Sequence, residues 1–289
     1  LGLGRADLHF VSEASLADFE VEEMRTFLRD KFKKEARFTS TDIESGHRTG
    51  GVGAICRAPH NLVAVKPLTA DFAELDSTGR VGIYSVECLG GHTLTFVVMY
   101  GWTGGAQSAC AAAKTSDLIS IVFRELQAQP DGPQFITGDL NASVPDLAAL
   151  QMALEETDED SLQAWHDIGA KADLLDSIPS EPTCKAPNAK GATRRDYVIA
   201  NSVGFGLVES FQVSWDDVYD VHATIRFTLN LEPLDVEKRV VNKAKSFHDK
   251  LSEMVRAEFG YSEEDSFSKD AWERWHWHLG NVRGFMKQR

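Results

Sequence analysis

The sequence predicts an α+β fold in which two β layers are flanked by helices, followed by a helical extension. Three observations support this prediction. Short runs rich in Val, Ile, Phe and Tyr recur throughout residues 1–231, as is typical of strands. Only a few well-separated amphipathic segments interrupt them, which argues against a strict alternation of strands and helices. After Pro233 the pattern changes to charged segments with apolar residues at helical spacing.

The expected elements follow a definite order along the chain. The β-rich runs cover residues 7–11, 51–57, 61–67, 81–88, 93–100, 134–137, 195–201, 206–214 and 222–229. Helices are expected at 16–32, 108–127 and 146–155. We therefore expect one domain over residues 1–231.

Residues 232–289 form the second expected unit, a helical tail or connector. Apolar residues recur at helical spacing from Val236 to Val255, and a second helix is expected at 271–284, where three tryptophans lie. Neither segment carries a catalytic pattern. The aromatic face is expected to pack on the main domain or on a further domain.

Charge and cysteine content limit the classes of function. The net charge is −14, and because residues 232–289 carry equal numbers of acidic and basic residues, the whole excess lies in residues 1–231. An acidic surface repels nucleic-acid phosphates, so any contact with DNA must be local, through a basic patch or a metal ion. The four cysteines form no CxxC pair, and no long apolar run could span a membrane. These features favour an intracellular protein, with the nucleus as one candidate compartment, over a secreted one.

A motif at a strand end gives the first chemical signal. The apolar run at 134–137 leads into Gly138, Asp139, Leu140 and Asn141. Because strand side chains alternate, Asp139 and Asn141 should emerge on the same side. A carboxylate there can orient or deprotonate a water, and a carboxamide can donate to a phosphate oxygen, which suits phosphoryl chemistry. The alternative is a plain turn, since Gly, Asp and Asn are favoured in turns.

Four further positions each have a functional and a structural interpretation. Asp196 opens an expected buried strand, where a charge is costly unless it has a partner. The structural interpretation is a surface ion pair at the start of the strand. His222 precedes the last strand, where a lone His is more often structural. Glu13 follows the first strand and Tyr100 ends an apolar one. Taken alone, Glu13 is an acid at the N-terminus of a helix, and Tyr100 is a core residue.

The order of these signals resembles the endonuclease/exonuclease/phosphatase superfamily, which includes apurinic endonucleases, DNase I-like nucleases, inositol polyphosphate phosphatases and the endonuclease domains of non-LTR retroelements. The resemblance covers residues 5–231, and its most specific part is GDLN at 138–141 followed by RRDYV at 194–198. It implies a four-layered α/β/β/α sandwich, the DNase I-like fold, with the site at one end of the two sheets.

The resemblance also implies roles for the acidic and amide groups. Glu13 would be the carboxylate that binds a metal, Mg²⁺ or Mn²⁺, since these hard cations prefer oxygen ligands. Asp139 would position and activate the attacking water, and Asn141 would hold the scissile phosphate. The metal would polarise the phosphoryl oxygen.

The remaining implied roles belong to three residues. His222 would stabilise negative charge on a non-bridging oxygen, and Asp196 would fix its tautomer and keep it protonated. Tyr100 would sit near the phosphate or the leaving group.

This chain departs from the family pattern in two places. The family has an Asp directly before the His of the last strand, where it helps to bind metal, but here that residue is Val221 and Asp220 stands one place further back. The family also begins with a strand that bears an Asn and precedes the Glu by more residues than the 12 found here. We therefore expect the domain to be N-terminally truncated and its metal binding to be weak.

A basic loop precedes the strand that Asp196 opens. Lys185, Lys190, Arg194 and Arg195 lie in a Pro/Gly/Asn-rich segment that leads into Asp196. This is the local patch that an acidic domain would need for DNA, although a solvated loop with chance basic residues is the alternative.

Three functions are compatible with the pattern. The first is an endonuclease that nicks DNA, as in a non-LTR retroelement, with a reverse transcriptase as a downstream partner. The second is a phosphatase for inositol phosphates or another small phosphoester. The third is an inactive relic of the fold that only binds partners. The sequence does not fix the oligomeric state.

Overall fold

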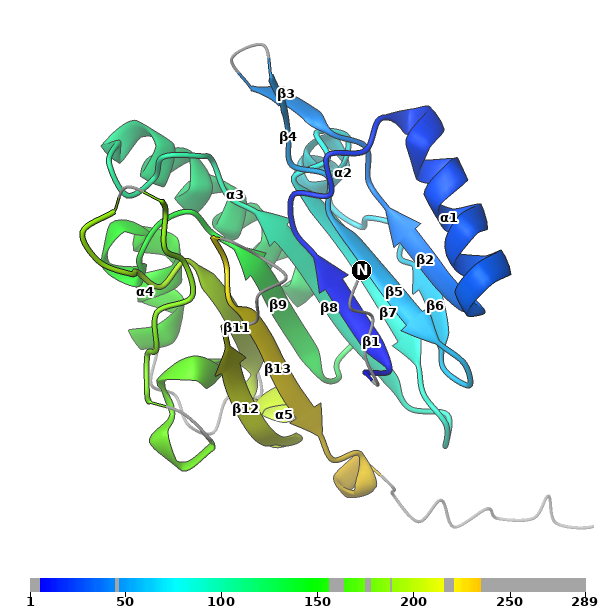
Figure 1. Cartoon of the computed structure of the whole chain (residues 1–289). Coiled ribbons are helices and arrows are strands. Elements are labelled where there is room, and N and C mark those ends of the chain that lie inside the picture. The colour runs from blue at the N-terminus through cyan, green and yellow to red at the C-terminus, as the bar shows by residue number, and fades with distance from the viewer. Residues whose placement is uncertain are drawn as a thin grey trace, which may run out of the picture. The chain divides into compact units, whose positions relative to one another are not determined.

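The structure is a computed structural model that describes residues 6–44, 47–155, 164–174, 178–187, 189–215 and 221–234 (Figure 1). The chain divides into two compact units, Leu1–Asp235 and Val236–Arg289. The expected helical tail falls almost entirely in the second unit, which lies outside the described residues. Among the helices that the structure describes, none combines the length and apolar character needed to cross a bilayer.

A six-stranded sheet forms the centre of the first unit. Its strands, in spatial order, are β10 (Trp165–Asp167), β11 (Asp196–Asn201), β9 (Gln134–Asp139), β8 (Thr93–Tyr100), β7 (Val81–Glu87) and β6 (Asn61–Ala64). Neighbours are antiparallel except β8 and β9, which are parallel. A parallel pair needs a long crossover, and α3 (Ala109–Ala128) supplies it.

A second β layer covers one face of this sheet. It contains a three-stranded sheet in the order β1 (Leu8–Val11), β5 (Gly53–Arg57) and β2 (Lys34–Phe38), and a pair formed by β12 (Val208–Ser214) and β13 (Thr224–Leu229). A separate hairpin joins β3 (Asp42–Glu44) to β4 (His47–Thr49). In Figure 1, β1 and β13 lie in front of β8 and β9.

The two β layers pack together because the strands alternate. In β8, Leu94, Phe96 and Val98 face the second layer, whereas Val97 and Met99 face the helices on the other side. Burying both faces of a strand requires a continuous apolar run, which is the pattern of residues 96–100.

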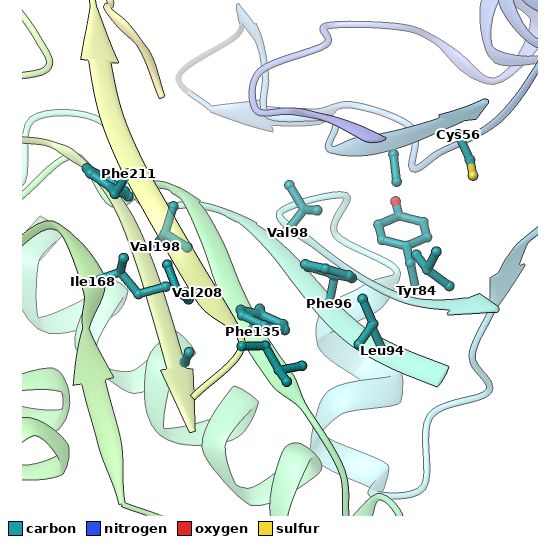
Figure 2. Close-up of a cluster of buried hydrophobic side chains, with 14 of the residues drawn as sticks. Cys56, Tyr84, Leu94, Phe96, Val98, Phe135, Ile168, Val198, Val208 and Phe211 are labelled. Atoms are coloured by element: carbon teal, nitrogen blue, oxygen red, sulfur yellow. The ribbon is translucent and has the colours of Figure 1, made fainter. Parts of the chain in front are cut away.

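A line of aromatic rings ties the layers together. Figure 2 shows its two central members, Phe96 and Phe135. The ring of Phe96 lies 4.7 Å from that of Phe10 on β1 and 4.9 Å from that of Phe135 on β9, between centroids. Phe135 in turn lies 6.2 Å from Phe227 on β13. Such ring pairs add stabilisation beyond the area they bury.

Helices form the two outer layers. On the free face of the six-stranded sheet lie α2 (Ala70–Asp76), α3 and α4 (Ala148–Glu155), which share one apolar core with it. On the other side α1 (Asp18–Phe32) packs against β2 and β5 through Leu28, Ala36 and Ile55. The predicted four-layered α/β/β/α sandwich is therefore confirmed. The short α5 (Ser202–Phe205) and 3-10 turns at Val144–Asp146, Ile168–Ala170, Ala172–Leu174 and Glu232–Leu234 complete the unit.

The expected elements are present, with shorter bounds at several ends. The run at 61–67 forms a strand only to Ala64, and His222 lies outside β13 in an isolated bridge. Six elements were not expected from the sequence, because they are short or charged and carry no apolar period: β2, β3, β4, α2, β10 and α5. The strand expected upstream of residue 1 stays a prediction. Within the described residues, β1 and β13 each stand at the end of their sheet.

Glu125 anchors one outer layer and is fully buried. Its carboxylate accepts hydrogen bonds from the backbone N–H groups of Leu68 and Thr69, from the Thr69 hydroxyl and from Gln129, at 2.6–2.8 Å. Burial alone would raise the pKa of Glu125, but these four hydrogen bonds lower it below 4.5. Thr69 caps α2, so Glu125 links α3 to the start of α2.

We expect Glu125→Gln to lower the free energy of unfolding at pH 7 by about 2 kcal/mol or more, because the amide turns an NH₂ group toward donors. A carboxylate with a lowered folded-state pKa stabilises the fold above its unfolded pKa. The difference between the parent and the variant should therefore shrink as the pH falls through the lowered pKa. Urea unfolding at several pH values measures this difference. The exposed Glu74→Gln is the control, and equal losses for both variants would contradict the prediction.

Candidate active site

Strand pairing places three of the predicted site residues side by side. Tyr100 is the register partner of Asp139 in the parallel pair of β8 and β9, and Asp139 is the register partner of Asp196 in the antiparallel pair of β9 and β11. The three positions therefore form a row across the same end of the six-stranded sheet. Residues that are nearly 100 positions apart in the sequence become neighbours through this register alone.

Backbone geometry at the end of β9 turns the GDLN motif into a compact site. Gly138 has φ 147°, and a Cβ there would lie 1.9 Å from the carbonyl oxygen of Met99, so only glycine fits. Asn141 adopts φ 55°, and its backbone N–H donates to the Asp139 carboxylate at 2.8 Å. Its side-chain Nδ2 donates to the carbonyl oxygen of Gly101 at 3.2 Å. The turn and the site are thus the same structure.

His222 meets both acidic residues. Its Nδ1 lies 2.9 Å from Oδ2 of Asp196, and its Nε2 lies 3.8 Å from Oδ2 of Asp139. The Asp196 carboxylate accepts a hydrogen bond from Nδ1–H of His222, so Nε2 of the ring points toward Asp139. A His oriented in this way by a carboxylate matches the predicted pair of Asp196 and His222.

Thr183 holds this pair in place, and the sequence analysis did not identify it. The residue is fully buried, and its hydroxyl accepts the backbone N–H groups of Arg195 at 3.0 Å and Asp196 at 2.9 Å. Its carbonyl oxygen accepts the N–H of Ala223, next to His222, at 2.7 Å. Thr183 has no local sequence signal, because its role depends on segments that meet only in the fold.

Glu13 reaches the site from the second β layer. It is exposed and adopts φ 58°, in the left-handed region that costs a non-glycine residue about 1–3 kcal/mol. The preceding residue, Ser12, donates from its hydroxyl to the carbonyl oxygen of Met99 at 3.2 Å and accepts the Asp139 N–H at 3.3 Å. These two bonds fix the Glu13 segment to the ends of β8 and β9. Ser12 was also missed by the sequence analysis.

The electrostatics of the site follow from this crowding. Burial raises the pKa of Asp139, and the charges of Asp196 and Glu13 raise it further, to about 7, against the lowering effects of His222 and the Asn141 N–H. The hydrogen bond to Asp196 raises the pKa of His222 despite its partial burial. The protonated form of His222 is thus favoured relative to a free imidazole, and Asp139 is poised between its two forms near neutral pH.

Tyr100 combines a core position with a place at the site. It is 3% exposed and belongs to the core between the sheets. Its hydroxyl lies 3.3 Å from the Thr103 hydroxyl. Burial raises the pKa of Tyr100 to about 12, and Glu13 contributes to that shift. The phenol therefore stays neutral and acts only as a hydrogen-bonding group.

The site has the composition of a hard-cation site. Within the described part of the chain, atoms of Asp139, Asp196 and His222 that could bind a metal lie within 4.8 Å of one another. Glu13 adds a third carboxylate whose charge acts on Asp139. The negative charges of Asp196 and Glu13 both act on Asp139, and a divalent cation would offset them. Oxygen-rich sets of this kind suit Mg²⁺ or Mn²⁺.

The basic loop borders the site, but its residues differ. Cys184 forms backbone bridges with both Thr193 and His222, which closes the loop beside the site. Lys185 and Lys190 are exposed, and Arg195 is half-buried.

Arg194 has a partner within the fold. It donates to the buried Asp167 carboxylate through two bonds of 2.7 and 2.6 Å, and its side chain is only 12% exposed. Its guanidinium carbon also lies 4.5 Å from the centroid of the Tyr197 ring. We therefore leave Arg194 out of the set proposed to contact DNA, because its charge is already bound to Asp167.

No family model matches the sequence, and no curated protein matches it. Solved structures do match. The 3'-5' exonuclease NExo from Neisseria meningitidis aligns with a TM-score of 0.56 and 13% identity over 80% of this chain and 91% of that chain. An AP endonuclease from Archaeoglobus fulgidus aligns with a TM-score of 0.52 and 14% identity over 78% and 90%. The endonuclease domain of TRAS1, a telomere-specific non-LTR retrotransposon, aligns with a TM-score of 0.51 and 14% identity over 78% and 87%.

These matches confirm the fold that the resemblance implied. At 13–14% identity they establish the architecture alone, which is the DNase I-like fold. They do not carry a substrate to this chain, because one fold hosts several functions.

We expect Arg194→Ala to destabilise the domain by about 3–5 kcal/mol, because it leaves the Asp167 carboxylate buried without its partner. Thermal melting and urea unfolding measure the loss. Lys190→Ala is the control, since an exposed lysine should change stability by less than about 0.5 kcal/mol. If Arg194→Ala melts like the parent but binds DNA more weakly, the loop arginine contacts nucleic acid after all.

Proposed function

We propose that the first unit is a metal-dependent phosphodiesterase that nicks DNA as an endonuclease. The observation that carries the proposal is the arrangement of Asp139, His222 and Asp196 at one end of the sheet. A buried carboxylate whose pKa is raised to about 7 faces a His that a second carboxylate orients and whose pKa is also raised. This pairing of a base with a hydrogen-bond donor suits attack of water on a phosphate.

The chain's own residues then have distinct tasks. Deprotonated Asp139 takes a proton from a water as the water oxygen bonds to phosphorus. The Nε2–H of His222 donates to a non-bridging oxygen, where negative charge grows, and Asp196 holds the imidazole in that orientation. The amide of Asn141 donates to the same phosphate. The bond to the leaving oxygen breaks, and that oxygen takes up a proton from solvent.

A hard divalent cation held by Glu13 would polarise the phosphoryl oxygen and offset charge on the leaving oxygen. Tyr100 lies in the same row as Asp139 and stays neutral, so it can donate a hydrogen bond to the phosphate or the leaving group. Its role is thus positioning rather than proton transfer.

DNA is the substrate that the surroundings favour. Lys185 and Lys190 are exposed on a loop tied to His222, and Arg195 adjoins Asp196. A local basic patch lets an otherwise acidic domain bind a phosphate backbone. NExo, one of the similar structures, has been solved with a product DNA hairpin. The narrower form of the proposal, a retroelement nuclease working beside a reverse transcriptase, rests on the likeness to TRAS1 and on the expected tail.

A small phosphoester is the second candidate, because the same groups could hydrolyse an inositol phosphate. Loss of activity is the third, because Val221 replaces the acidic residue that the resemblance leads us to expect. Assays with supercoiled plasmid and with an inositol phosphate separate the three. Nicking supports the proposal, and phosphate release supports the second candidate. If the protein shows neither activity with Mg²⁺ or Mn²⁺, the result supports an inactive relic.

We expect Asp139→Asn and His222→Ala each to lower Mg²⁺-dependent nicking of supercoiled plasmid by about 10²-fold or more, because each removes a group that acts mainly in the transition state. The thermal melting temperature should change little. Asp131→Asn is the matched control, since Asp131 is exposed near the opposite end of β9. A variant at either site that nicks at the parental rate would show that its assigned role is wrong.

Val221 occupies a position where a second metal-binding carboxylate is expected from the resemblance. The residue is half-buried, and it does not belong to any of the three core clusters. Its carbonyl oxygen accepts the Lys185 N–H at 2.8 Å, so its backbone is fixed beside the basic loop. The alternative that Val221 is a packed core residue is therefore not favoured. Asp220, which precedes it, lies outside the described residues.

We expect Val221→Asp to lower the Mg²⁺ concentration needed for half-maximal nicking, because a second carboxylate strengthens the attraction for a strongly hydrated cation. The melting temperature should stay close to that of the parent. Val221→Asn is the control, since it matches the Asp in shape without adding charge. A large fall in melting temperature without a lower metal requirement would mean that the new carboxylate is buried and unpaired.

A further inference from the structure

Arg80 is a fully buried arginine that the mechanism above does not use. It precedes β7 and is 0% exposed. An arginine is almost never fully buried unless its guanidinium is well paired. The guanidinium of Arg80 donates hydrogen bonds to two different segments, and each segment contacts a different part of the active site. We call these two sets of contacts the first and the second arm.

The first arm leads to Asn141. Nη1 of Arg80 donates to the carbonyl oxygen of Gly101 at 3.1 Å, and this oxygen also accepts Nδ2 of Asn141 at 3.2 Å. The backbone carbonyl of Arg80 accepts the N–H of Tyr100 at 2.8 Å. The guanidinium carbon stacks 3.8 Å from the centroid of the Trp102 ring. Arg80 thus fixes the loop after β8 by its backbone, its side-chain bond and its stacking.

The second arm leads to Glu13. Nη2 of Arg80 donates to the Thr49 hydroxyl at 3.2 Å. The next two residues, Gly50 and Gly51, accept the N–H groups of Ser15 at 3.0 Å and Ala14 at 2.6 Å through their carbonyls. Those two bonds hold the segment in which Glu13 adopts its left-handed conformation.

The second arm is also tied to Arg80 through the backbone. Gly51 donates its N–H to Gly79, the residue before Arg80, at 2.9 Å. A Cβ on Gly50 would lie 3.7 Å from Cγ of Arg80, so this segment rests against the arginine stem.

We propose that Arg80 is a positioning residue that sets the distance between Glu13 and Asn141, and so between the cation and the phosphate. The planar fork of an arginine offers donors in two fixed directions, which one lysine ammonium cannot reproduce. Arg80 is buried, so it acts on the site through Glu13 and Asn141 and does not touch the substrate. The inference deepens the proposed function and rests on it for the roles of Glu13 and Asn141.

The first experiment is a double-mutant cycle. We expect Arg80→Lys to lower kcat for plasmid nicking at saturating Mg²⁺ by about 10-fold or more, because small misplacements of reacting groups are costly. In an Asn141→Ala background the same substitution should cost less than about 3-fold, since residues that act through one contact are not additive. Full multiplicative losses in both backgrounds would mean that Arg80 acts independently of Asn141, and would overturn the proposal. Arg124→Lys, at a surface arginine that pairs with Asp71, is the matched control.

The second experiment does not depend on activity. Mn²⁺ binding, measured by electron paramagnetic resonance, should weaken about 10-fold in Arg80→Lys. Losses of this size are typical when a residue that orients a metal ligand is replaced. The side-chain amide signals of Asn141 in a ¹⁵N–¹H spectrum should shift as well. Thr49→Val breaks only the second arm, so it should weaken Mn²⁺ binding and leave those amide signals in place.

The outcomes separate the two proposals. If the parent cleaves no phosphodiester, the proposed function fails, while Mn²⁺ binding and the Asn141 signals still decide the role of Arg80. If Arg80→Lys changes neither the Mn²⁺ affinity nor these signals, the positioning role is wrong even if the parent nicks DNA. If Arg80→Lys does not fold, Thr49→Val decides the second arm, and unchanged Mn²⁺ binding in that variant overturns the proposal.

Discussion

Three strands, β8, β9 and β11, must pair in one register for the acidic and aromatic groups to meet. Tyr100, Asp139 and Asp196 occupy adjacent positions only in that alignment. A slip of one residue in β9 would turn Asp139 to the opposite face of the sheet. The register is held by apolar side chains on both faces of these strands, so the packing of the two cores determines the geometry of the site. Gly138 serves the same end, because no other residue would let β9 lie so close to β8.

The sequence was a good guide wherever a signal was local. The apolar runs predicted most of the six-stranded sheet, and the order of GDLN, RRDYV and His222 predicted the fold that the solved structures confirm. The short strand β2 escaped because charged residues alternate along it, and β10 because it has only three residues. Their existence depends on pairing with strands far away in the chain, which a local pattern does not reveal.

The contacts around the site were less predictable than its acidic residues. Ser12, Thr183 and Arg80 act through hydrogen bonds to backbone groups that lie 13 to 127 positions away in the sequence. Arg194 shows the opposite case, since it stands in a basic stretch and yet pairs with the buried Asp167. Composition alone does not distinguish a cation that faces solvent from one that is already bound.

The Glu13 segment and the His222 segment have a consequence for the synthesis of the protein. They come from opposite ends of the described chain, and both meet the end of β9. A ribosome delivers residues from the N-terminus onward, so a nascent chain that already contains the whole six-stranded sheet still lacks the imidazole. The cluster at the end of the sheet is therefore complete only after the last strand pair has left the exit tunnel. Until then, the emerging chain lacks the imidazole on which the proposed activity depends.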